Sequence, residues 1–121
     1  MNRVIILSLI TLFSLCVSAK NEPRNIALEH HGGNHIENYE PADKPEAYYD
    51  VDNQEIILVA DGFVSSYDVN IISLSTMSLT LHSTANGYGD TIDVSSLPDD
   101  DYKIVISTPY NNVYVGFFTN Y

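Results

Sequence analysis

From residue 46 onward, apolar and polar residues alternate along short segments, and this spacing predicts β-strands. Successive side chains of an extended strand point to opposite faces, so a period of two places the apolar residues together on one face. The clearest examples are Tyr67, Val69 and Ile71, which alternate with Asp68 and Asn70. The pattern predicts strands over 47–51, 55–60, 67–71, 77–81, 92–94, 102–106 and 113–117.

The spacing of these segments predicts the fold class. Seven short strands follow one another at intervals of about 8 to 12 residues, and no stretch of ten residues has a helical period. This arrangement is typical of an antiparallel β-sandwich with one core between two sheets. We expect the core to include Ile57, Val69, Ile71, Leu79, Leu81, Ile104 and Ile106.

The first 45 residues have a different pattern. Residues 1–19 combine Arg3, an apolar stretch of about 12 residues and the small Ala19, which predicts a secretory signal peptide cleaved after Ala19. The stretch is too short for a membrane span, which needs about 20 residues. Cys16 offers lipid attachment as an alternative, but Leu15 stands where lipoprotein signals carry a small residue.

We therefore expect a secreted or periplasmic protein that is not inserted in a membrane after cleavage. Residues 20–45 are polar and contain several prolines and glycines, which is typical of a flexible leader. Ile26 and Leu28 alternate there and allow a short edge strand over 24–29. The β-sandwich is predicted to span 46–121.

Composition excludes several classes of function. The chain has 121 residues, with 16 acidic and 5 basic side chains and a formal net charge of −11. Nucleic-acid binding needs a basic patch, and an anionic membrane surface repels such a chain. A disulfide framework is excluded because the chain contains 1 cysteine.

The most specific local pattern runs from Leu97 through Pro98 to Tyr102. Proline presets the backbone of a turn, and the leucine can fill the core at a corner of the sandwich. Tyr102 begins the next strand, and its hydroxyl can return to nearby backbone as in a tyrosine corner. This pattern predicts a folding device and carries no function.

The export signal, the polar leader with Ile26-Ala27-Leu28, and this corner leading into Lys103-Ile104-Val105-Ile106 together give the chain a family resemblance. It resembles domain-of-unknown-function family 3244, which comprises small exported proteins of Bacteroidota. The resemblance implies an immunoglobulin-like or fibronectin-III-like sandwich. Asp100 stands where such corners usually carry glycine. The family provides no catalytic residues to transfer.

Three groups of residues are candidates for chemistry. Tyr88, Tyr110 and Tyr114 lie in or beside predicted loops, where exposed tyrosines can stack on sugars or anchor a protein partner. The leader contributes the second group, His30, His31 and His35, whose imidazoles suit zinc, copper or nickel. The third is His82, which would need both a nucleophilic hydroxyl and a carboxylate to act in a hydrolase.

We interpret the sequence as a secreted, noncatalytic sandwich that binds a protein or a glycan and needs no cofactor. A periplasmic metal-binding protein using the three leader histidines is the alternative, and a small hydrolase is a second alternative. The sequence does not indicate an oligomeric state.

Overall fold

The computed structural model describes residues 21–31 and 42–121. Within these ranges the chain forms nine strands: β1 (Arg24–Ile26), β2 (Glu29–His31), β3 (Glu46–Asp50), β4 (Glu55–Val59), β5 (Ser66–Ser73), β6 (Leu79–Asn86), β7 (Gly89–Asp93), β8 (Asp100–Ser107) and β9 (Val113–Asn120). The predicted signal peptide and His35 lie outside the described residues. Among the described residues, no helix is long and apolar enough to span a membrane.

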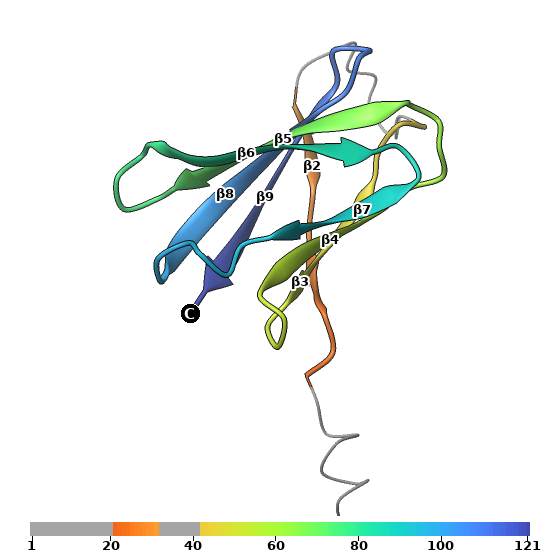
Figure 1. The fold of residues 1–121 in the computed structure, drawn as a ribbon. Helices are drawn as coiled ribbons and strands as arrows, with labels where there is room; N and C mark the ends of the chain where they lie inside the picture. The colour runs from red at the N-terminus through yellow and green to blue at the C-terminus, as the bar shows by residue number, and fades with distance from the viewer. Residues whose placement is uncertain (1–20, 32–41) are drawn as a thin grey trace, which may run out of the picture.

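The strands form two antiparallel sheets that pack as the layers of a sandwich (Figure 1). One sheet has the order β1-β3-β4-β7, and the other has the order β2-β9-β8-β5-β6. The all-β sandwich expected from the sequence is confirmed, and each of the seven predicted strands has a counterpart in β3 to β9.

The sandwich begins earlier than residue 46, so the predicted boundary between leader and domain is wrong. β1 pairs with β3 in one sheet, and β2 pairs with β9 in the other, so residues 24–31 cross from one layer to the other. Ile26 and Leu28 are both buried at this crossing. Gly116 of β9 makes room for them, because a Cβ there would lie 2.6 Å from Cγ2 of Ile26.

The core lies between the two sheets and contains four of the seven residues expected in it. Val69, Ile71, Ile104 and Ile106 are buried. The other expectations, Ile57, Leu79 and Leu81, are wrong or only partly met.

In β4, Ile57 is only half-buried, because the strand turns Ile56 and Leu58 toward the core instead. In β6, Leu81 is half-buried and Leu79 is 59% exposed. This strand is the outermost of its sheet, and the register shifts at its start, opposite Ile71 and Ile72.

The corner before β8 has the contacts that its sequence predicts. The Tyr102 hydroxyl donates to the carbonyl oxygen of Pro98 at 2.5 Å, and Leu97 packs against the core. The ring of Phe118 stacks between Tyr102 and Tyr49, with centroid distances of 5.5 and 5.4 Å. This corner and its aromatic stack therefore close one end of the sandwich.

Candidate binding site

Three exposed aromatic side chains gather at the opposite end of the sandwich, on three different loops. Phe63 lies between β4 and β5, Tyr88 between β6 and β7, and Tyr110 between β8 and β9. Their exposed fractions are 55%, 77% and 62%. In Figure 1 the β4–β5 and β6–β7 loops lie at the right and the β8–β9 loop lies at the top. We call Phe63, Tyr88 and Tyr110 the aromatic loop cluster.

The first two loops are joined by backbone hydrogen bonds. The Gly62 N–H donates to the Gly87 carbonyl oxygen at 2.9 Å, and the Gly87 N–H donates to that of Ser65 at 3.1 Å. The Tyr88 ring lies over Gly62, where an added Cβ would be 2.2 Å from Cε1 of the ring. Gly62 also has a φ of +82°, a backbone conformation that residues other than glycine rarely adopt. The position of Tyr88 thus depends on Gly62.

Contact between rings links the third loop to the first. The ring centroids of Phe63 and Tyr110 are 6.0 Å apart and the rings are tilted by 56°, which is a favourable aromatic geometry. Because this pair remains more than half exposed, it presents ring faces and edges to solvent.

A buried carboxylate holds the loop that carries Tyr110. Asp43 is 2% exposed. Its Oδ2 accepts hydrogen bonds from the Thr108 hydroxyl at 2.8 Å and from Nδ2 of Asn112 at 2.9 Å. Its Oδ1 accepts from the Tyr114 hydroxyl. Thr108 and Asn112 are the two ends of the loop, so Asp43 fixes both of them.

These hydrogen bonds keep Asp43 ionised although it is buried. Burial raises the pKa of the Asp43 carboxyl, but the bonds from Asn112, Tyr114 and Thr108 lower it by more, so the pKa lies below its ordinary value. A buried charge of this kind is costly unless hydrogen bonds satisfy it. The network therefore favours one conformation of the loop.

The leader histidines are separated by the strand that carries them. His30 faces inward, where Nε2 lies 2.9 Å from Oδ1 of Asn112 and the ring packs on Tyr114 at 5.4 Å. His31 lies on the opposite face of β2, with Nε2 3.5 Å from the Glu29 carboxylate. Neighbours on a strand cannot converge on one ion. Because His35 is outside the described residues, metal binding by the three histidines stays a prediction.

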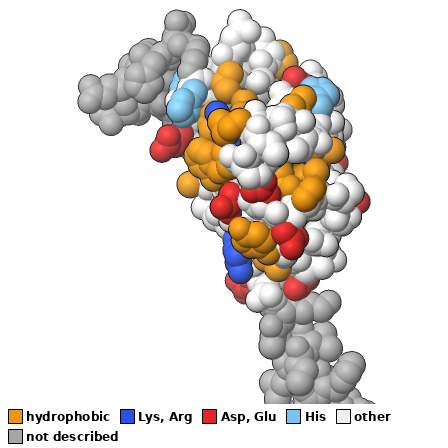
Figure 2. All heavy atoms as spheres, turned by 90° about the vertical axis from the view of Figure 1, so that its left-hand side faces the viewer, with side chains coloured by type: hydrophobic (Ala, Val, Ile, Leu, Met, Phe, Trp, Pro, Cys, Tyr) orange, Lys and Arg blue, Asp and Glu red, His pale blue; other side chains and the backbone are white. Residues whose placement is uncertain are grey.

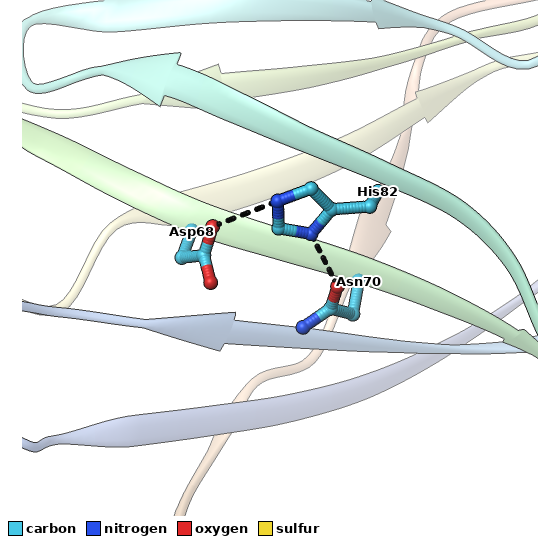
Figure 3. A network of polar contacts seen from close by, with 3 residues as sticks. All are labelled: Asp68, Asn70 and His82. Atoms are coloured by element: carbon cyan, nitrogen blue, oxygen red, sulfur yellow. Dashed lines mark hydrogen bonds and ion pairs between the residues drawn. The ribbon is translucent and has the colours of Figure 1, made fainter.

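His82 lies in a different polar cluster, on the outer face of the five-stranded sheet (Figure 3). Its Nδ1 is 2.6 Å from Oδ1 of Asn70, and its Nε2 is 3.3 Å from Oδ1 of Asp68. The hydrolase alternative requires a hydroxyl as well as a carboxylate. Among the described residues, the second partner of His82 is the amide oxygen of Asn70, and no hydroxyl is bonded to its ring.

Other exposed apolar side chains are more dispersed. Seen from the left-hand side of Figure 1, the surface carries several separate groups of hydrophobic side chains with acidic side chains between them (Figure 2). Leu79 and Phe117, on the outer face of the five-stranded sheet, are 59% and 60% exposed. Ile72 and Lys103 stand between them in one cross-strand row. The aromatic loop cluster differs in that its rings are on loops and are fixed by neighbours.

Of the three tyrosines expected to bind a ligand, the structure brings together two. Tyr114 is fully buried, because it belongs to the inward-facing set of β9 and its hydroxyl serves Asp43. Through Asp43, Tyr114 helps to hold the loop that carries Tyr110. Phe63 is the member that sequence reasoning missed, although its place after Asp61-Gly62, a loop signal, could have indicated an exposed aromatic.

Comparison with solved structures identifies the type of sandwich. A crystal structure of a DUF3244 family protein with an immunoglobulin-like β-sandwich fold, from Bacteroides vulgatus, matches this chain with a TM-score of 0.64. The match covers 83% of this chain and 100% of that chain at 14% sequence identity. No family model and no curated protein matches the sequence. The chain therefore has an immunoglobulin-like fold, as the resemblance implies.

Proposed function

We propose that this protein is a noncatalytic recognition module of the cell exterior or periplasm that binds a protein or a glycan through the aromatic loop cluster. The observation that carries the proposal is the exposure of Phe63, Tyr88 and Tyr110 on three loops of one end. Solvent-exposed aromatic rings are rarely gathered and held in place without a binding role.

The chemistry of the cluster fits ligands with apolar faces and polar edges. A tyrosine or phenylalanine ring can stack on the C–H face of a sugar or enter a pocket of a partner protein, while a tyrosine hydroxyl forms hydrogen bonds at the rim. The rings lose little conformational entropy on binding, because Gly62 and the Asp43 network already hold two of the loops.

The surroundings of the cluster favour recognition over catalysis. The exposed Asp61 carboxylate accepts the Phe63 N–H at 3.3 Å and so holds its own loop. The other carboxylate beside the cluster, Asp43, is buried and saturated with hydrogen bonds. It supports a loop and does not face a substrate. A location outside the cytoplasm rests on the signal peptide that residues 1–19 predict.

Binding assays that compare matched variants test the proposal. The full chain is applied to a glycan array and used to capture proteins from the envelope of the source organism, beside Tyr88→Ala and Tyr110→Ala. Loss of an aromatic anchor typically costs about 2 kcal/mol or more, so each variant should bind at least tenfold more weakly.

Tyr121→Ala is the matched control. Tyr121 is 70% exposed but follows β9 at the other end of the sandwich, so its removal should leave binding unchanged. Equal loss of binding in Tyr121→Ala and Tyr88→Ala, or retention in both, contradicts the proposed site.

A further inference from the structure

The four edges of the two sheets differ in how they are protected from pairing with another strand. Exposed edges invite association, and natural sheets protect them by shortness, charge or proline. β1 and β2 are edges of three residues each, and β7 is an edge that carries Asp90 and Asp93.

β6 is an edge of eight residues, Leu79–Asn86, and contains no proline, lysine, arginine or carboxylate. The register shift near Leu79 affects only its start, and the pairing with β5 is regular from Leu81 to Asn86. Among the residues that the structure describes, the other side of β6 has no partner strand.

The direction of the backbone groups of β6 follows from two contacts at its end. The Gly87 N–H donates to Ser65, just before β5, whereas the Asn86 N–H donates to Oδ2 of Asp90, away from β5. Along an antiparallel strand, successive residues direct their N–H and C=O groups alternately to the two sides. Thr84 and His82 lie two and four residues before Asn86, so their backbone N–H and C=O groups also point toward the open edge.

We propose that two copies of this chain associate through β6, antiparallel about a twofold axis at Ser83, so that the five-stranded sheets join into one. In this register the backbone N–H and C=O of His82 form two hydrogen bonds with the C=O and N–H of Thr84 in the partner copy. The twofold axis repeats this pair, so the dimer has four backbone hydrogen bonds. Leu81 faces Ala85 of the other copy, and both lie on the core side of the sheet. The edge thus complements itself without bringing two charges together.

The charge of the whole chain limits the strength of this dimer. Two copies with a formal charge of −11 each repel one another, whereas the edge itself contains no carboxylate, lysine or arginine. Added salt screens the repulsion and leaves the hydrogen bonds in place. A dimer formed by one strand pair buries little surface, so we expect a dissociation constant in the micromolar range or above.

Cross-linking tests the register. In a chain carrying Cys16→Ser, we add Ser83→Cys and expose the protein to mild oxidation. Position 83 then lies opposite position 83 of the other copy as a non-hydrogen-bonded pair. The Cα atoms of such a pair are about 4.5 Å apart, which is close enough for a disulfide. Thr84→Cys in the same background is the control, because its two Cα atoms would be roughly 8 Å apart. A covalent dimer should form with Ser83→Cys and not with Thr84→Cys.

Sedimentation of the full chain with Cys16→Ser tests the association itself. We expect a monomer–dimer equilibrium that becomes several-fold tighter between low and high salt, and at least tenfold weaker in Thr84→Pro, which removes an outward N–H. Thr84→Lys, which leaves the backbone intact and adds a charge, should have the same effect if the proline variant does not fold.

Three results overturn the proposal: a monomer at all concentrations up to about 0.5 mM in high salt, a dimer that persists in both Thr84 variants, or equal cross-linking at positions 83 and 84. Because neither Thr84 nor Ser83 belongs to the aromatic loop cluster, failure here leaves the proposed ligand binding untouched.

Discussion

At each end of this sandwich, one polar side chain holds a turn or loop in place through its hydrogen bonds. At one end, Tyr102 ties the turn before β8 to the strand, and its ring packs on Phe118. At the other end, Asp43 gathers three donors around one carboxylate. Both are buried polar groups whose hydrogen bonds are satisfied, which is the condition under which such groups stabilise a fold.

Replacement of Tyr102 by phenylalanine measures the first of these contacts. It removes the hydroxyl and leaves the Pro98 carbonyl oxygen without this donor, so the free energy of unfolding should fall by about 1 kcal/mol. Chemical denaturation measures the change. Tyr121→Phe, whose hydroxyl is on an exposed residue, should have no effect. Equal stability of Tyr102→Phe and the parent chain would contradict the corner described above.

Asp43→Ala tests the second contact. It leaves the buried hydroxyls of Thr108 and Tyr114 and the amide of Asn112 without their acceptor, so the loss should reach about 3 kcal/mol. Hydrogen exchange of the loop 108–112 should also become faster, because both of its ends are released. Unchanged exchange in this loop would show that Asp43 does not hold it.

The lowered pKa of Asp43 predicts an acid dependence of stability. The folded-state pKa lies below the unfolded one, so its contribution is complete above the unfolded value, about pH 4, and is lost as the pH falls through the folded value. Denaturation at a series of pH values from 6 to 2 measures this. Asp43→Asn should show a shallower loss below pH 4 than the parent chain, and identical slopes would contradict it.

At the scale of elements, the sequence predicts strands well and the faces of some strands poorly. The segment from Tyr67 to Ile71 alternates strictly, so its inward face was predicted correctly. The run from Ile56 to Val59 is apolar throughout, and a period of two cannot choose between its faces. In β9 both faces carry apolar residues, and Phe117 points outward while Phe118 is buried.

The first two strands and Phe63 show where pattern reasoning stops. The alternation of Ile26 and Leu28 allows one short edge strand over 24–29, whereas the structure has two strands of three residues, β1 and β2, which pair with β3 and β9 in different sheets. The grouping of Phe63 with Tyr88 and Tyr110 depends on which loops meet in space, and this follows from the sheet topology. The buried role of Tyr114 likewise depends on a contact with Asp43, 71 residues away.

Gly116→Val tests whether residues 24–31 belong to the sandwich. The new side chain would collide with Ile26 and with the backbone oxygen of Ala27, so the crossing segment would have to move from its place. Crowding of this kind costs about 1–3 kcal/mol. Thermal unfolding should show the loss, whereas Val115→Thr, on the outward face of the same strand, should change stability little. A stable Gly116→Val chain with slow exchange at Ile26 would contradict the packing.

For the molecule as a whole, the proposed function places recognition at one end of the sandwich and a closed, packed corner at the other. The corner and the aromatic stack close one end, and the loops at the other end expose their rings. The formal net charge of −11 predicts repulsion from nucleic acids and between copies of the chain. Recognition by this molecule should therefore depend on aromatic contacts more than on charge.

The most direct test of this account is to map the ligand contact by NMR, using the glycan or protein retained in the binding assays. Backbone amide resonances of the full chain are followed during titration. The account predicts that the largest shifts occur in 61–65, 87–88 and 108–112, and that they disappear in Tyr88→Ala. Shifts centred on the Leu97–Tyr102 corner or on the outer faces of the sheets would contradict it.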